Sequence, residues 1–161
     1  GPGSFTSLRI GIGVVQGLAW ASACPVVPVS SLAATAQSAV DEGVGSALVA
    51  LDARMDEVFT GMFEADDNGI MMPVGEERVC PPEDVSMPDD TETFGVGIGF
   101  DRYPVLMEAA GSLRGVLVDT WPRASSLLRL AKAWLATNEA LPAEMAQPVY
   151  LRDNVAKKSQ G

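Results

Sequence analysis

The chain begins with Gly-Pro-Gly-Ser, residue types that often surround phosphate groups in nucleotide-binding proteins. Glycines leave backbone N–H groups accessible, and the start of a helix directs several of these groups at an anion. Gly1, Gly3 and Ser4 are therefore candidate phosphate ligands. The stretch lacks the lysine and the spacing of a Walker motif, so a structural turn that positions the next helix is the alternative interpretation. The glycine-rich run at residues 95–99 is a weaker candidate, because glycines in a strand also permit tight packing.

A second polar group, Asp52, Arg54 and Glu57, follows an apolar run that is typical of a strand. The carboxylates of Asp52 and Glu57 could act as a general acid and a general base. Alternatively, the segment is a turn held by an ion pair between Asp52 and Arg54, which is a common structural use of these residues. Asp52 and Arg54 also remain candidates for contact with a nucleotide.

Composition excludes several classes of catalytic site. The 161 residues contain no histidine, which excludes Ser-His-Asp and Cys-His nucleophiles and every histidine-based zinc site within this sequence. Two widely spaced cysteines, Cys24 and Cys80, are too few for a thiolate zinc site and are typical of a reducing compartment. The net charge of −10 argues against autonomous binding of RNA, because phosphate contacts require a basic surface. We expect no bound metal and no catalytic residue.

A helix is expected to begin after Ser4 or Thr6, either of which can cap its first turn. Helical spacing places four apolar residues on one face, where we expect them to pack on the body of the protein: Leu8, Ile12, Val15 and Ala19. Gly13 and Gly17 are four residues apart on another face and would permit close approach of a second helix. The predicted interface region therefore comprises Leu8, Ile12, Gly13, Gln16, Gly17 and Trp20. Gln16 and Trp20 are expected to face the partner together with the two glycines.

The uncharged stretch 10–29 could be taken for a signal peptide or a membrane span. Its glycines weaken an apolar signal core, and Pro25 and Pro28 interrupt any long helix. We therefore expect no membrane association and a cytoplasmic location.

The remaining pattern predicts an α/β domain with a mixed sheet, because a strand meander is followed by alternating strands and helices. The expected strands are 26–29, 47–51, 57–64, 70–72, 76–80, 94–100 and 115–118, with a last extended piece at 148–151. The expected helices are 31–40, closed by Gly43, then one starting near 81, and those at 103–110 and 122–136.

Three blocks of the sequence, in the right order, resemble the TsaB (YeaZ) family. Residues 1–11, GPGSFTSLRIG, are similar to the family signature GPGSFTGLRIG, with Ser7 where the family has glycine. Residues 52–59, DARMDEVF, are similar to the family's DARMGEVY. Residues 148–156, PVYLRDNVA, contain the PVYLR of its C-terminal segment. Together the blocks extend over nearly the whole chain, which makes the resemblance specific.

The resemblance implies the α/β fold of the actin/Hsp70-like ATPases, which consists of two ribonuclease-H-like lobes. Residues 1–43 would be the remainder of the N-terminal lobe, residues 46–156 the complete C-terminal lobe, and residues 157–161 a tail. Family members begin several dozen residues before the signature, so we expect that the sequence as given lacks an N-terminal segment. In actin-like ATPases, a position comparable to Asp52 can hold a metal ion.

The resemblance also implies a function. TsaB proteins are non-catalytic subunits that pair with TsaD, which transfers a threonylcarbamoyl group to the tRNA adenosine next to the anticodon. TsaE, an ATPase, joins the complex, and TsaB also forms homodimers. By this resemblance, tRNA is reached only through the complex, no cofactor is bound tightly, and ATP or ADP is bound through the complex. The alternatives are a glycoprotease-like hydrolase, which would rely on Asp52 and Glu57, and a weak nucleotide-binding protein of the ATPase fold.

Overall fold

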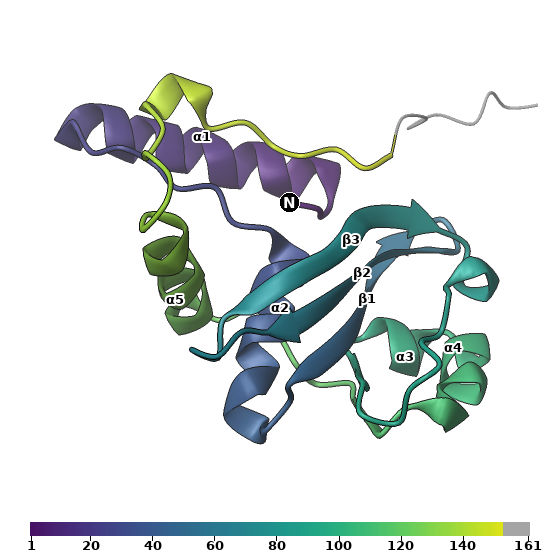
Figure 1. The fold of residues 1–161 in the computed structure, drawn as a ribbon. Coiled ribbons are helices and arrows are strands. Elements are labelled where there is room, and N and C mark those ends of the chain that lie inside the picture. The colour runs from purple at the N-terminus through teal and green to yellow at the C-terminus, as the bar shows by residue number, and fades with distance from the viewer. Residues whose placement is uncertain (153–161) are drawn as a thin grey trace, which may run out of the picture.

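The computed structural model describes residues 1–152, which form a mixed α/β structure with helices on both faces of a sheet (Figure 1). Its helices are α1 (Phe5–Ser22), α2 (Ser31–Ala39), α3 (Gly99–Arg102), α4 (Pro104–Ala109) and α5 (Ala124–Trp134). Its strands are β1 (Ser46–Arg54), β2 (Glu57–Ala65), β3 (Met71–Cys80), β4 (Phe94–Val96) and β5 (Gly115–Leu117). Single 3-10 turns lie at Val40–Glu42, Pro82–Asp84, Ala110–Ser112 and Ala143–Met145. The expected tail, 157–161, and residues 153–156 of the expected C-terminal lobe lie outside the described residues.

The sheet formed by the described residues has the order β3-β2-β1-β4-β5. The β1–β2 and β2–β3 pairs are antiparallel, as the predicted meander requires, whereas β4 lies parallel to both β1 and β5. Parallel neighbours need crossover connections, and here α3 and α4 lie in the connection from β4 to β5. The mixed sheet that the sequence pattern predicts is therefore confirmed.

The alternation of side chains along β2 divides the core into two clusters. Phe59 and Phe63 lie in the cluster that α2 covers, where they pack with Leu32 and Ala36 among others. Side chains from the opposite face of β2, beginning at Val58, lie in the cluster formed with α3 and α4. Successive strand residues point to opposite faces of a sheet, so both faces of β2 are buried.

Helix α1 begins directly after its capping residue, Ser4. Ser4 has extended backbone geometry, and its Oγ accepts a hydrogen bond from the N–H of Ser7 at 3.3 Å. The helix ends at Ala23, which adopts a left-handed conformation with φ of 51°. Within residues 1–152, no helix combines the length and apolar character needed to cross a membrane.

Three local predictions were wrong. Val26 forms one isolated bridge to Leu141 instead of a strand over 26–29. The two strands expected at 70–72 and 76–80 are one strand, β3, because a bulge near Gly75, with φ of 83°, shifts the register while pairing with β2 continues on both sides of it. β4 ends at Val96, because Gly97 adopts φ of 107° and turns the chain into α3.

The expected boundary between residues 43 and 46 separates elements that share one core. Leu32, Ala36 and Ala39 of α2 belong to the same buried cluster as Val49 and Phe63 of the sheet. Within residues 1–152, helix α1, unlike α2, contributes no residue to this cluster. Its C-terminal part instead lies over the 3-10 turn Ala143–Met145. The division into two lobes stays a prediction for this chain.

Candidate functional site

A cleft of about 740 Å³ brings together most of the candidate nucleotide-binding residues. Gly3, Ser4, Asp52 and Arg54 all line it, although they come from two segments far apart in the sequence. The other lining residues are Pro2, Ser7, Ser31, Leu51, Ala53, Phe59, Ile98, Asp101, Arg102, Trp121 and Pro122. Gly1 is not among them, and its carbonyl oxygen accepts a hydrogen bond from the N–H of Ser31 at 2.8 Å. The carbonyl of Gly1 therefore holds the start of α2.

The hydroxyl of Ser4 serves the local structure of α1. Ser4 Oγ accepts from the backbone N–H of Ser7 and donates to Ser7 Oγ at 2.8 Å. Ser4 is thus the cap of α1, and the role of residues 1–4 in phosphate binding stays a prediction.

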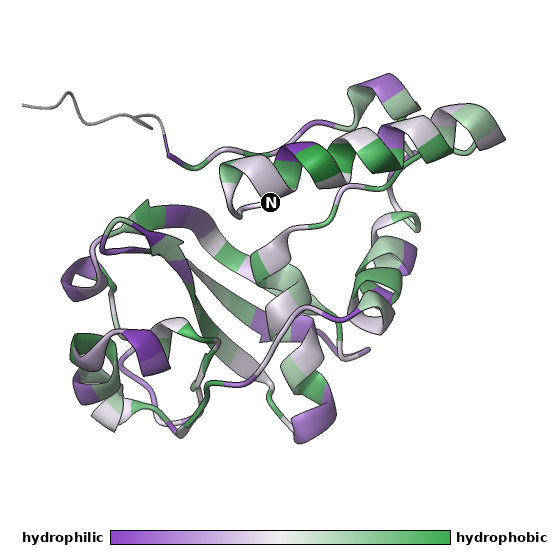
Figure 2. Cartoon of the chain, turned by 180° about the vertical axis from the view of Figure 1, so that it is seen from behind, coloured by the Kyte–Doolittle hydropathy of each residue, from purple (hydrophilic) through white to green (hydrophobic). Residues whose placement is uncertain are grey.

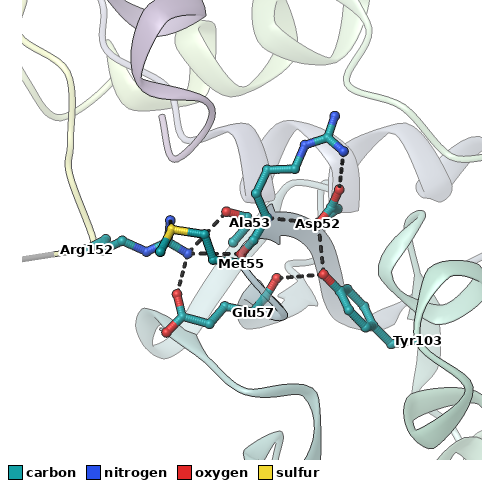
Figure 3. A network of polar contacts seen from close by, with 7 residues as sticks. Asp52, Ala53, Met55, Glu57, Tyr103 and Arg152 are labelled. Carbon is teal, nitrogen blue, oxygen red and sulfur yellow. Dashed lines mark hydrogen bonds and ion pairs between the residues drawn. The ribbon is translucent and has the colours of Figure 1, made fainter. Parts of the chain in front are cut away.

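Asp52 is the centre of a polar network on the wall of the cleft (Figure 3). Its Oδ1 accepts from the N–H of Arg54 at 2.8 Å and from the hydroxyl of Tyr103 at 2.9 Å. Its Oδ2 forms ion pairs with Arg54 Nη1 at 3.3 Å and with Arg102 Nε at 3.2 Å. The Asp52 side chain is only 12% exposed, so these pairs are partly shielded from water. The predicted turn held by Asp52 and Arg54 is therefore confirmed.

Tyr103 is a member of this network that sequence reasoning missed. Burial raises the pKa of its phenol, and the Asp52 carboxylate raises it further because both favour the neutral donor. Tyr103 lies 51 residues from Asp52, and no local pattern signals a contact at that separation. Tyr103 directly follows α3, and its phenol reaches the end of β1 from there.

Glu57 forms a separate ion pair. Its Oε2 accepts from Nη2 of Arg152, 95 residues later (Figure 3). Asp52 instead pairs with Arg54 and Arg102. Because the two carboxylates are held by different guanidinium groups, the geometry does not favour a shared acid–base role. Residues 1–152 contain no group of three or more acidic or cysteine side chains placed to hold a metal ion.

The faces of α1 differ in part from those expected. Leu8 and Ile12 are half-buried and Ala19 is buried, as expected for the inward face, but Val15 is 43% exposed. Gln16 was expected to face a partner, and this prediction was wrong. Its Nε2 donates to the carbonyl oxygen of Ala146 at 2.9 Å, so its side chain is turned toward its own chain.

The outward face of α1 contains the remaining candidates and three residues that were missed. Gly13 and Gly17 are exposed, with open space where a Cβ would lie, and Trp20 is 74% exposed. Ile10, Val14 and Leu18 are 64%, 56% and 66% exposed, which the four-residue spacing could have indicated. We call Ile10, Gly13, Val14, Gly17, Leu18 and Trp20 the outer face of α1. In Figure 2 hydrophobic and neutral colours predominate along this helix.

Comparisons with solved structures define the class of protein. The chain superposes on YeaZ from Pseudomonas aeruginosa with a TM-score of 0.81 and 41% sequence identity, over 94% of this chain and 71% of that one. A crystal structure described as an uncharacterized protein with similarity to peptidase YEAZ from Pseudomonas aeruginosa gives a TM-score of 0.85 and 43% identity, over 94% and 70%. The mixed sheet with its flanking helices is thus a YeaZ-type fold, consistent with the actin/Hsp70-like class.

Sequence comparisons identify the family within this class. The chain is 39% identical over 162 residues to the tRNA threonylcarbamoyladenosine biosynthesis protein TsaB of Escherichia coli K12, and 34% identical over 167 residues to that of Haemophilus influenzae. Each match covers 98% of this chain and 70% of the relative. Residues 1–93 also match the family model described as TsaD: tRNA N6-adenosine threonylcarbamoyltransferase. The chain belongs to the TsaB family, as the three sequence blocks predicted.

Proposed function

We propose that this chain is a non-catalytic subunit that supports TsaD during threonylcarbamoylation of tRNA. The observation that carries the proposal is the outer face of α1. Ile10, Val14, Leu18 and Trp20 are between 56% and 74% exposed on one 18-residue helix. A contiguous apolar surface of this kind is typical of a protein interface, because its burial is favourable. Gly13 and Gly17 leave room between these side chains for a helix of the partner.

The match to the TsaD family model supports TsaD as that partner. The matched residues, 1–93, include α1, so the two proteins share a related sequence over this helix. Two related chains can pack equivalent helices against each other about a local two-fold axis, as identical chains do in an isologous dimer. The same surface would serve a homodimer, so self-association and pairing with TsaD would compete.

Several features of the site support a non-catalytic role. The sequence contains no histidine that could activate a nucleophile, and Ser4 Oγ is engaged with Ser7. Asp52 and Glu57 are held in separate ion pairs. Among residues 1–152, the geometry therefore favours no general base for the alternative of a glycoprotease-like hydrolase.

The charges of the cleft support weak or no nucleotide binding by this chain alone. Arg54 and Arg102 line the cleft, but both pair with Asp52, so a phosphate group would have to compete with a carboxylate. We propose that no cofactor is held tightly, and that ATP or ADP is bound in the complex with TsaD and the ATPase TsaE. The net charge of −10 does not favour direct binding of tRNA, so we propose that tRNA is contacted only through the complex. We also propose that the complex works in the cytoplasm.

The experiment that tests the proposal measures the mass of complexes by size exclusion with light scattering. The full-length protein is mixed with TsaD from the same organism, with and without TsaE and ATP. The proposal expects a heterodimer that forms at the expense of the homodimer, and threonylcarbamoylation that depends on both proteins. Absence of a complex under every condition would overturn the proposal. Modification of tRNA by this chain without TsaD would overturn the non-catalytic role.

A further inference from the structure

The last described residues, 146–152, run along α1 in the opposite direction to the helix (Figure 1). We call residues 146–152 the strap. Its first residue, Ala146, accepts the hydrogen bond from Gln16. Further along, the ring of Tyr150 lies 5.7 Å from that of Phe5, and its hydroxyl accepts from Arg9 Nε at 3.2 Å. The strap is therefore attached to α1 at two points.

The strap ends on the β1–β2 turn (Figure 3). Arg152 Nη2 donates to the carbonyl oxygens of Ala53 at 3.1 Å and Arg54 at 3.2 Å, and to Glu57 Oε2. Its Nη1 lies 3.5 Å from the sulfur of Met55. The Arg152 side chain is only 18% exposed, so one guanidinium group binds both sides of the turn in a partly shielded position.

The turn that Arg152 contacts has an unfavourable backbone conformation. Arg54, Met55 and Asp56 have φ angles of 62°, 57° and 59°, and none of them is glycine. Three successive left-handed residues are disfavoured, because each Cβ approaches a carbonyl oxygen. Such a conformation persists only where surrounding contacts hold it. Here the contacts come from Asp52 within the turn and from Arg152 at the end of the strap.

We propose that the strap couples α1 to the β1–β2 turn, with Arg152 as a positioning residue for Arg54 at the cleft. A change in the position of α1 moves Tyr150, and the chain from Tyr150 to Arg152 is too short to absorb that movement. The turn then loses contacts that oppose its strain. The inference goes beyond the proposed function, because it depends on contacts within one chain and on no partner.

Hydrogen exchange of the turn amides, measured by mass spectrometry on the full-length protein, tests the coupling. Arg152→Ala removes hydrogen bonds to a charged group, and we expect about tenfold faster exchange at residues 53–57. Tyr150→Ala changes only the end at α1, yet we expect it to accelerate exchange at the same amides. The exchange rates at residues 53–57 in the double variant should equal those in Arg152→Ala, because the coupling passes through Arg152.

Matched controls separate coupling from loss of stability. Arg129→Ala, on α5, removes an exposed ion pair with Asp41 of the 3-10 turn Val40–Glu42 and should leave exchange at the β1–β2 turn amides unchanged. Exchange at the central β1 amides, residues 48–50, should equal that of the wild type in every variant. Arg152→Lys keeps the charge without the planar fork and should restore part of the protection. Unchanged turn exchange in Tyr150→Ala, or independent effects that multiply in the double variant, would overturn the proposal.

Discussion

The hydroxyl of Tyr103 lies 2.9 Å from Asp52 Oδ1 and 3.3 Å from the carbonyl oxygen of Glu57. This phenol joins the residue before α4 to both strands of the β1–β2 hairpin. Since Asp52 also pairs with Arg54 and Arg102, Tyr103 helps to set how these cations line the cleft.

Tyr103→Phe should lower the free energy of unfolding by about 1 kcal/mol at neutral pH, the usual net contribution of a hydrogen bond, because the ring remains and the donor is lost. Urea unfolding followed by circular dichroism measures the difference. Tyr150→Phe is the control. Because the Tyr150 side chain is exposed, this variant should lower the free energy of unfolding by less.

The contribution of Tyr103 should also depend on pH. Its pKa in the folded protein is raised above the ordinary value of 10.0 by burial and by Asp52. The stability from this group is therefore fully present below pH 10 and is lost as the pH rises through the raised pKa. The stability difference between wild type and Tyr103→Phe should shrink at alkaline pH, and a difference that stays constant there would contradict the assignment.

Gly97→Ala should destabilise the fold more than Gly111→Ala. Gly97 has φ of 107°, and a Cβ there would lie 2.6 Å from the carbonyl oxygen of Ala50. Left-handed strain alone costs about 1–3 kcal/mol, and the clash adds to it. Gly111 has nothing within 4 Å of a Cβ, so alanine is tolerated. Equal melting temperatures for the two variants would contradict this explanation.

Asp66 in the β2–β3 turn should stabilise the protein in a pH-dependent way. Its Oδ1 accepts from the N–H groups of Asn68 at 2.9 Å and Ile70 at 2.8 Å, and the Ile70 bond is the main cause of a pKa below 3.8. This contribution is present above pH 3.8 and is lost as the pH falls through the lowered pKa.

Asp66→Asn keeps an acceptor oxygen, whereas Asp66→Ala removes it. Urea unfolding should therefore rank wild type above Asp66→Asn and Asp66→Asn above Asp66→Ala at neutral pH. The difference between wild type and Asp66→Asn should diminish on acidification below pH 3.8. A difference that grows on acidification would show that the carboxylate has the opposite role.

Local patterns were sufficient to predict α1, α2 and an antiparallel meander that begins with β1 and β2, although β3 was divided into two strands. The cap at Ser4 depends only on neighbouring residues, and it is confirmed. The contacts of Tyr103 with Asp52 and of Arg152 with Glu57 span 51 and 95 residues, so only the topology could reveal them. Gln16 was misplaced because its partner, Ala146, belongs to a segment 130 residues away.

The most direct test of the account replaces Val14 on the outer face of α1. Val14 is 56% exposed, so Val14→Glu should leave the fold and its melting temperature unchanged. At an interface, the new carboxylate would be buried without a compensating positive charge, which should weaken association roughly a hundredfold. Met107→Glu on α4, 43% exposed in the free protein, is the matched control.

The measurement is light scattering of each variant mixed with TsaD at micromolar concentration. The account predicts that wild type and Met107→Glu form the heterodimer, while folded Val14→Glu elutes as a monomer beside free TsaD. A heterodimer of wild-type mass with Val14→Glu would contradict the assignment of the outer face of α1 as the TsaD-binding surface.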